Sequence, residues 1–391
     1  MKHKLMRITT VPISLLVLLK KQLVFMSQYF DVLAVSSAGD ALQQVGKEVP
    51  VRIKAVNMTR RVTPLQDLVG IFKLCRVMLA ERPSIVHTHT PKAGLLGMIA
   101  AKLVGVPIRL HTVAGLPVLE KKGLLKWTMG ITEVLTSACA THIYANSPNM
   151  MRLMIDRRYC TGEKIKVIGR GSTGGIDTAV FNPDLPEIIA AKTETRIALK
   201  LKENAFVYCF IGRMVGDKGI SELVGAFCNL HQQNPQMVLL LVGPFENELD
   251  PLPAAIHKLI KEHEGIRWLD FQTDIRKYLA ISHVFVFPSY REGFPNVIMQ
   301  AGAMGVPCIV SNINGCNEII NEGINGLIVP VKNIFHLEQA MARLHATPNE
   351  RINMATASRA IIQSRYESDL LIGQIFSEYK LQIQKYNHKN Q

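Results

Sequence analysis

The chain has 391 residues, of which 48% are hydrophobic and 19% are charged, so its length predicts two domains, or three, with sizeable apolar cores. A formal net charge of +14 favours an anionic partner such as a nucleic acid, a nucleotide or an acidic membrane surface. No apolar stretch reaches the ~20 residues of a membrane-spanning helix. Seven cysteines without a C-x-x-C pair show no zinc-site spacing and indicate reduced thiols in a cytosolic protein.

The first 180 residues alternate between expected strands and helices. The apolar N-terminal run could be read as a signal peptide, but Arg7 interrupts it and no small-residue cleavage site follows. We therefore predict a strand at 5–11 and a helix at 13–30. Three further helices are expected to begin with a cap residue followed by proline, at Thr63, Thr90 and Ser147. The other expected elements are a helix at 124–140 and strands at 31–37, 84–88, 107–113, 142–145 and 164–168.

The second half repeats this alternation after a Pro-rich break at 181–186, the expected linker. Strands are expected at 205–211, 237–242, 266–271, 284–287 and 308–311, a hairpin-like segment at 326–330, and helices at 219–233, 253–262, 274–282, 296–304 and from 334. Alternating strands and helices predict an α/β fold with two Rossmann-like, doubly wound parallel-sheet lobes. The lobes are expected at 1–180 and 187–366, followed by a C-terminal helix at 367–391 that could cross back to the first lobe.

The stretch 284–303 carries the clearest functional signal. An apolar run at 284–287 predicts a buried strand, Pro288 and Gly293 end it, and apolar residues at helical spacing predict a helix from Asn296. Backbone N–H groups at a helix start suit a diphosphate, and the Glu292 carboxylate could accept hydrogen bonds from sugar hydroxyls. The same pattern also fits an ordinary strand-to-helix turn with a solvent-facing Glu292.

This stretch resembles the signature of family 4 retaining glycosyltransferases of the GT-B fold, especially the bacterial capsular and surface polysaccharide group. In that family a first Glu contacts the transferred sugar, and a second Glu, after seven intervening residues, holds the nucleotide ribose. Glu292 takes the first place here and Gln300 the second, where an amide can still bond a ribose hydroxyl. The resemblance implies two lobes facing a cleft, with the donor bound by Gly293, Phe294, Pro295, Asn296, Val297 and Gln300.

Two cations follow the first expected strand of the second lobe. Arg213 comes directly after Gly212, and Lys218 lies in Gly216-Asp217-Lys218-Gly219. Loops at the carboxyl ends of parallel strands form ligand crevices, where both cations could bind phosphate oxygens; a solvated loop with two surface cations is the alternative. The segment resembles the family's G-R-x-x-x-x-K-G element, which implies that Arg213, Lys218 and Glu292 are the catalytic residues. No D-x-D motif appears, so no metal and no cofactor are expected.

Polar residues at strand ends in the first lobe form the expected acceptor side. His87 and His89 share one face of a strand, so a metal site is conceivable, but no carboxylate or Cys lies nearby in sequence. The resemblance places His89 and Lys92 beside the acceptor, where they would suit a second diphosphate. His87 is expected to be a core residue, as is usual for a histidine on a buried strand. Thr10 and His111 are assigned to the same side. The family's usual His before a glycine is Ala114 here, so no catalytic histidine is carried over.

A glycine motif at 169–174 fits G-x-G-x-x-G after a strand, which would suit a dinucleotide. The residues that follow, Phe181-Asn182-Pro183, cannot start the helix that this motif requires, so we reject an NAD site. The segment resembles a family element that lines the cleft between the lobes, and a simple linker turn is equally compatible.

The combined hypothesis is a retaining transfer of a hexose or N-acetylhexosamine from a nucleoside-diphosphate sugar, UDP by preference, to a glycan acceptor. The resemblance and the basic charge suggest a polyprenyl-diphosphate-linked saccharide in surface polysaccharide synthesis. The enzyme is then expected in the cytoplasm, in peripheral contact with the inner membrane. The helix at 13–30 could touch that surface, although its apolar face fits the core better.

Two other functions fit part of the sequence. A UDP-N-acetylhexosamine epimerase or hydrolase of the same fold would need a carboxylate and histidine set that the sequence does not assign. A non-enzymatic nucleotide-sugar sensor or a nucleic-acid-binding protein could use the positive charge. Scattered basic residues without interleaved aromatic residues argue against nucleic acid.

Overall fold

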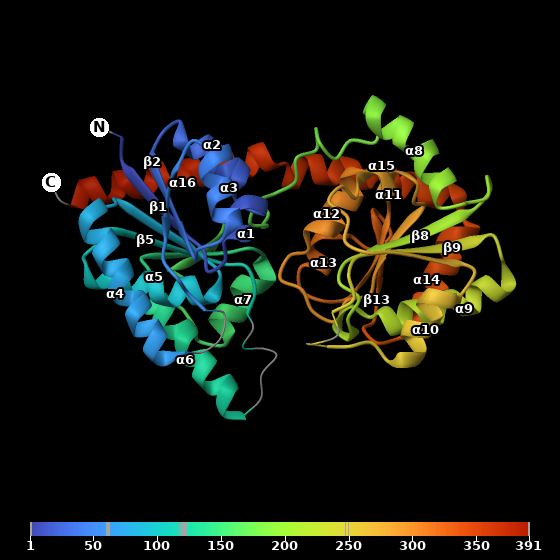
Figure 1. Ribbon diagram of the computed structural model, residues 1–391, viewed down its shortest axis with the longest axis horizontal. Coiled ribbons are helices and arrows are strands. Elements are labelled where there is room, and N and C mark those ends of the chain that lie inside the picture. Colours follow the sequence, from blue (N-terminus) through green and yellow to red (C-terminus); the bar gives the residue numbers. More distant parts are fainter. Residues whose placement is uncertain are drawn as a thin grey trace. The chain divides into compact units, whose positions relative to one another are not determined.

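The chain forms two compact units. The computed structural model describes residues 2–59, 63–116, 118, 123–246, 248 and 250–389 (Figure 1). Unit 1 comprises Met1–Gly174 and Asp369–Gln391, and unit 2 comprises Gly175–Ser368. The C-terminal segment therefore belongs to the first unit, and residues 181–186, the expected linker, lie inside the second. None of the described helices is long and apolar enough to cross a bilayer.

Unit 1 is built on a parallel sheet. Among the described residues it has seven strands in the order β3-β2-β1-β4-β5-β6-β7. Their bounds are β1 Lys4–Ile8, β2 Asp31–Ser36, β3 Arg52–Ala55, β4 Ile85–His89, β5 Ile108–Val113, β6 His142–Ala145 and β7 Ile165–Val167. The edge strand β3 was not expected, because its four residues are mostly exposed and lack an apolar run.

Helices cover both faces of this sheet. They are α1 Pro12–Val17, α2 Lys20–Ser27, α3 Asp40–Glu48, α4 Pro64–Glu81, α5 Pro91–Leu103, α6 Gly123–Cys139, α7 Pro148–Asp156 and α16 Ser368–Lys389. Alternate residues of β1 point to opposite faces. Leu5 packs in the cluster that includes residues of α1, α2, α3 and α16, whereas Met6 packs in the cluster that includes residues of α4 and α5.

The single helix predicted at 13–30 is wrong, because the structure has two helices, α1 and α2, with a break at Leu18 and Leu19. Leu15 and Leu23 are fully buried, whereas Leu18 is 42% exposed. The apolar face of this segment is thus mainly core, as preferred from the sequence.

Unit 2 has a second parallel sheet, of six strands in the order β10-β9-β8-β11-β12-β13 within the described residues. The bounds are β8 Phe206–Ile211, β9 Met237–Val242, β10 Ile266–Leu269, β11 Val284–Phe287, β12 Cys308–Ser311 and β13 Gly326–Val329. Its helices are α8 Pro186–Ala198, α9 Ile220–Gln233, α10 Ala254–Glu262, α11 Arg276–Ala280, α12 Asn296–Ala303, α13 Cys316–Ile319, α14 Ile334–Ala346 and α15 Pro348–Tyr366. The hairpin-like reading of 326–330 is wrong, because β13 pairs with β12 in parallel.

Each sheet has a point where the strand order reverses. In unit 1 the chain moves outward from β1 through β2 to β3 and then returns to the other side of β1 as β4. In unit 2 it moves from β8 through β9 to β10 and returns beside β8 as β11. Ligands of such sheets bind beyond the carboxyl ends of the strands at this reversal. The candidate ligand sites therefore lie at the β1/β4 and β8/β11 ends.

Candidate active site

The carboxyl ends of β8 and β11 bring the expected donor-side residues together. The loop after β8 holds Arg213 and ends in the short helix η2 (Gly216–Lys218), and the loop after β11 holds Glu292. Gly219 follows η2 with a φ of +70°, and a Cβ there would lie 2.2 Å from the carbonyl oxygen of Pro288. Glycine is therefore required for the two loops to approach this closely.

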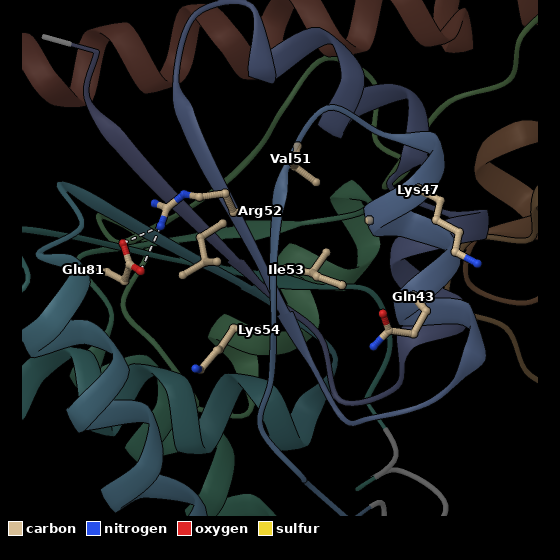
Figure 2. A pocket seen from close by; sticks show the side chains of 9 residues that line it. Gln43, Lys47, Val51, Arg52, Ile53, Lys54 and Glu81 are labelled. Atoms are coloured by element: carbon tan, nitrogen blue, oxygen red, sulfur yellow. Dashed lines mark hydrogen bonds and ion pairs between the residues drawn. The ribbon is translucent and has the colours of Figure 1, made fainter.

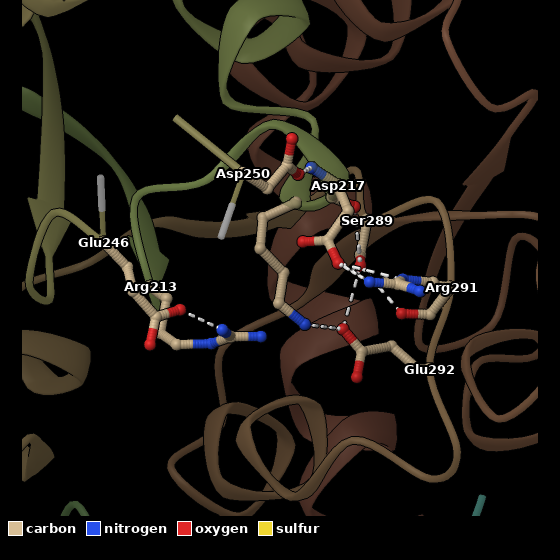
Figure 3. A network of polar contacts seen from close by, with 8 residues as sticks. Arg213, Asp217, Glu246, Asp250, Ser289, Arg291 and Glu292 are labelled. Carbon is tan, nitrogen blue, oxygen red and sulfur yellow. Dashed lines mark hydrogen bonds and ion pairs between the residues drawn. The ribbon is translucent and has the colours of Figure 1, made fainter. Parts of the chain in front are cut away.

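Lys218 and Glu292 form an ion pair between these loops. Lys218 Nζ lies 2.5 Å from Glu292 Oε1, and the two side chains are only 14% and 15% exposed. Ser289 Oγ donates a hydrogen bond of 2.9 Å to the same carboxylate oxygen (Figure 3). The ammonium group also lies 5.6 Å from the centre of the Phe287 ring. A cation and a carboxylate are thus held together, mostly out of water, at the reversal point of the sheet.

A second ion pair fastens the same two loops. Arg291 donates from Nε and Nη2 to Asp217 Oδ2 at 2.9 and 2.6 Å. The Tyr290 amide donates to the Asp217 carbonyl oxygen at 2.8 Å, and the Asp250 carboxylate accepts from the Asp217 amide at 2.6 Å. Figure 3 shows Asp217 between Asp250 and Arg291. These bonds fix the backbone from which Lys218 projects. The sequence did not predict this ion pair, because nothing in the sequence of either loop indicates that Asp217 and Arg291 interact.

Arg213 lies at the same sheet edge but in a separate contact. Its Nη1 group pairs with Glu246, which follows β9, and its side chain is 45% exposed. Figure 3 shows its guanidinium group extending toward the side on which Glu292 lies. Arg213 therefore has the freedom to exchange a solvent-accessible carboxylate for a phosphate, whereas Lys218 already lies in the buried centre.

The start of α12 supplies backbone donors beside Glu292. Its N-cap is Pro295, and no side chain caps the first turn. The turn before it is held by the loop after β12: Asn314 Nδ2 donates to the Gly293 carbonyl oxygen at 3.2 Å. Gly315 has a φ of +78°, and a Cβ there would lie 2.5 Å from that same oxygen. First-turn N–H groups without an intrahelical partner can receive an anion. Gln300 is one turn into this helix and half-buried.

The β1/β4 ends in unit 1 hold a second set of expected residues. Thr10 Oγ1 lies 2.7 Å from Thr90 Oγ1 and accepts a 3.1 Å hydrogen bond from the Ala93 amide at the start of α5. Thr90 has a φ of +77°, which a β-branched residue rarely adopts. Such strain, held by surrounding hydrogen bonds, is common in functional turns.

The other acceptor-side residues are buried around this turn. Lys92 Nζ pairs with Asp67 Oδ2 at 2.6 Å, and both side chains are mostly buried. His89 is 6% exposed, neither of its ring nitrogens has a hydrogen-bond partner among the described residues, and burial lowers its pKa well below the ordinary value. His111 bonds Thr88 Oγ1 at 2.8 Å, and burial lowers its pKa to about 4. Both imidazoles are therefore neutral at pH 7 and could serve a ligand as neutral donors or acceptors.

Below these residues lies a buried network that the sequence did not reveal. Arg7 is fully buried and donates to Tyr379 Oη at 2.7 Å and to Gln22 Oε1 at 2.8 Å. Tyr379 Oη also lies 2.5 Å from His87 Nδ1, while His87 Nε2 bonds Thr112 Oγ1. His87 is thus a core residue, as expected. The network joins β1 to α16, and because these elements lie at opposite ends of the sequence, no local pattern predicts the contact.

A pocket lies elsewhere in unit 1, beside the edge strand β3 (Figure 2). Arg52 and Lys54 line it, and Arg52 pairs with Glu81 and Asp31. None of the expected site residues lines it. Among the described residues, no three His, Cys, Asp or Glu side chains form a group that could hold a metal ion.

Comparison with known proteins identifies the family. Residues 26–171 match the glycosyl transferase 4-like domain, and residues 191–361 match the glycosyl transferases group 1. A capsular polysaccharide biosynthesis glycosyltransferase of Staphylococcus aureus is 30% identical over 363 residues, which cover 93% of each chain. The chain is a family 4 glycosyltransferase.

Other relatives of this glycosyltransferase are named for particular reactions. The UDP-Gal:α-D-GlcNAc-diphosphoundecaprenol α-1,3-galactosyltransferase of Escherichia coli is 30% identical and covers 73% of each chain. The N,N'-diacetylbacillosaminyl-diphospho-undecaprenol α-1,3-N-acetylgalactosaminyltransferase of Campylobacter jejuni is 26% identical and covers 75% of this chain and 76% of its own. These matches confirm the glycosyltransferase class expected from the sequence.

Solved structures show the same fold. Anabaena HepE in complex with UDP and glucose superposes with a TM-score of 0.81 at 20% identity, over 97% of this chain and 99% of its own. A glycosyltransferase from Rickettsia africae gives a TM-score of 0.79 at 19% identity, over 98% and 99% of the two chains. The two-lobe α/β fold of the GT-B class is confirmed.

Proposed function

We propose that this glycosyltransferase moves a hexose or N-acetylhexosamine from a UDP-sugar to a polyprenyl-diphosphate-linked glycan, with retention of configuration, in surface polysaccharide synthesis. The observation that carries the proposal is the Lys218–Glu292 pair at the β8/β11 reversal, beside the uncapped start of α12. The names of the Escherichia coli and Campylobacter relatives support the lipid-linked acceptor, and the former supports the UDP donor.

The donor diphosphate would bind where the cations and amides converge. Lys218 would exchange Glu292 for a phosphate oxygen, and Arg213 would exchange its exposed partner Glu246. The backbone of Gly293, Phe294, Pro295, Asn296 and Val297 would line the phosphates, with N–H donors from the non-proline residues. Freed from Lys218, the Glu292 carboxylate could accept hydrogen bonds from the transferred sugar, and Gln300 could bond the ribose. Positive charge arranged in advance stabilises the leaving diphosphate.

The proposed transfer needs no separate protein base, because the departing diphosphate can accept the proton of the acceptor hydroxyl. The bond between the sugar C1 and the diphosphate oxygen breaks, a bond from C1 to the acceptor oxygen forms on the same face, and the departing phosphate takes the acceptor's proton. Because cations and amides neutralise the diphosphate, we propose a metal-independent reaction without a cofactor. The acceptor would bind unit 1 near Thr10, His89, Lys92 and His111. We also propose a cytoplasmic enzyme in peripheral contact with the inner membrane.

A two-stage screen tests this proposal. A panel of UDP- and GDP-sugars is first scored for thermal stabilisation of the full chain, and the hits are then incubated with polyprenyl-diphosphate-linked saccharides. The expected result is a UDP-sugar that stabilises the protein and a product whose new linkage has the donor's anomeric configuration by NMR. An inverted linkage would refute retention. Release of free sugar or an epimer from donor alone, with no transfer, would favour the hydrolase or epimerase instead.

A further inference from the structure

Helix α4 presents an apolar stripe to solvent. Leu65, Phe72 and Leu79 are 81%, 62% and 60% exposed, and Leu68 and Val69 lie beside them with more than half of each side chain exposed. These residues recur at three- and four-residue spacing on the side of α4 opposite its buried positions, Gly70, Leu74 and Met78. The stripe is therefore not an edge of the core but the outward face of the helix.

Helix α6 repeats the pattern. Trp127 is 65% exposed, and Ile131, Val134 and Leu135 are each between 38% and 45% exposed. They fall on the outward side of α6, away from the buried Glu133. Single exposed apolar residues are ordinary, but two parallel stripes on neighbouring helices are the kind of surface that marks an interaction site.

The two stripes lie on one side of unit 1. Helix α5 contacts α4 on one flank and α6 on the other, and Figure 1 shows the three helices together below the sheet. Most of α5 is buried, but Leu103 at its end is 71% exposed. The outward sides of α4 and α6, with Leu103, therefore form one surface, which we call the α4/α6 face.

The charges on this face have one sign. Among the described residues of α4, α5 and α6, the exposed charged side chains are Lys73, Arg76 and Lys102. The carboxylates of α4 are neutralised, Asp67 by Lys92 and Glu81 by Lys4 and Arg52. The Arg76 guanidinium carbon lies 6.0 Å from the centre of the Phe72 ring, so this cation runs along the apolar stripe. Apolar side chains flanked by long basic ones suit the boundary of an anionic bilayer.

We propose that the α4/α6 face docks on an anionic lipid bilayer, with α4 and α6 lying in the plane of the headgroups. The inference rests on the proposed function in one respect: a polyprenyl-linked acceptor resides in such a membrane. A second copy of the chain is a poorer occupant, because a two-fold interface through this face would bring like surfaces together and oppose the basic side chains of one copy to those of the other. Lipid phosphates neutralise them instead.

Sedimentation of the full chain with lipid vesicles tests this proposal and does not depend on enzymatic activity. We expect binding to phosphatidylcholine vesicles that contain phosphatidylglycerol, and much weaker binding to phosphatidylcholine alone or at high salt. Phe72→Ser should weaken binding about tenfold, because it removes a large apolar side chain from the interface. The double variant Lys73→Gln, Arg76→Gln should weaken binding to the anionic vesicles selectively. Ile197→Ser is the matched control, since Ile197 is 71% exposed on α8 of unit 2.

Two results would overturn the proposal. One is vesicle binding that is unchanged in Phe72→Ser and in Trp127→Ser. The other is a parent chain that does not bind vesicles but self-associates in sedimentation without vesicles, with Phe72→Ser abolishing the self-association. The α4/α6 face would then bind a second copy of the chain. Transfer to a short, water-soluble acceptor should be the same in Phe72→Ser and the parent. Loss of vesicle binding with that activity intact separates failure at this surface from failure of the proposed function.

Discussion

Replacing Lys218 with methionine removes one charge from the centre of the proposed donor site and keeps most of the side-chain volume. Lys218 Nζ lies 2.5 Å from Glu292 Oε1, with 14% of the lysine side chain exposed. If the donor diphosphate replaces Glu292 in this contact, Lys218→Met should impair the chemical step far more than it impairs folding.

The size of the effect follows from the burial of the pair. Two unit charges about 4 Å apart interact by about 4 kcal/mol at an effective dielectric of about 20. Removing one preorganised donor from a developing anion lowers kcat by roughly 100- to 1000-fold in comparable sites. We therefore expect kcat for Lys218→Met to fall by at least 100-fold.

The fold should survive the same substitution. Glu292 loses its cation, but it keeps the hydrogen bond from Ser289 Oγ and some contact with water. Leaving a partly buried carboxylate without its ion partner costs on the order of 1–3 kcal/mol. Unit 2 retains its large apolar core, so the variant should remain folded with a lowered melting temperature.

The assay is single-turnover transfer from the UDP-sugar that the screen identifies, with melting temperature measured on the same samples. Lys258→Met is the matched control. Lys258 is 72% exposed on α10, and its substitution also removes one positive charge from unit 2. The control should keep its rate. A folded Lys218→Met variant with near-normal turnover would refute the reasoning, since no cation would then be needed at the reversal point.

Three further predictions concern groups around and away from this centre. Arg291→Ala should lower kcat/KM for the donor about tenfold, because it removes the ion pair with Asp217 that fixes the loop of Lys218. The double variant Arg291→Ala, Asp217→Asn should have nearly the same kcat/KM as Arg291→Ala, and fully additive losses would contradict the pairing of these two residues. Burial raises the pKa of Glu133 from 4.5 to about 7, so the folded chain holds a proton that the unfolded chain has released. The free energy of unfolding should therefore fall by roughly 3 kcal/mol as pH rises from 4.5 to 7, and Glu133→Gln should remove this fall. Urea unfolding above pH 7 would then show the variant to be more stable than the parent, and equal stability of the two proteins would refute the prediction. Tyr379→Phe leaves the buried Arg7 short of an acceptor and should cost roughly 2–3 kcal/mol of unfolding free energy in unit 1 without changing UDP binding, as urea titration and calorimetry would report.

The sequence predicted the parts of the fold that depend on local chemistry. Pro64, Pro91 and Pro148 each stand at the first residue of a helix, as expected. Of the three expected caps, only the Ser147 side chain accepts a hydrogen bond from its helix, and the caps expected at Thr63 and Thr90 are wrong because neither side chain accepts a hydrogen bond from a backbone N–H group of the first turn. The apolar run at 284–287 is the buried strand β11, because a strand covered on both faces needs apolar side chains throughout. Lys218 and Glu292 were assigned to one site and lie in contact.

Other features could not be predicted, because their causes lie far away in the chain. The strand β3 forms at an exposed edge, where it gains hydrogen bonds from β2 without an apolar pattern. Arg7 interrupts an apolar run in the sequence, whereas in the fold α16 supplies Tyr379, whose hydroxyl accepts a hydrogen bond from Arg7 inside the core. The partners of Arg213 and Lys92, which are Glu246 and Asp67, likewise come from neighbouring loops and helices that no local pattern connects.

The most direct test of the central claim is the position of the diphosphate in a crystal structure of the chain with UDP. We predict phosphate oxygens within about 3 Å of Lys218 Nζ and of N–H groups at the start of α12, with Glu292 no longer paired to that lysine. UDP bound elsewhere, with the Lys218–Glu292 pair intact, would contradict the account.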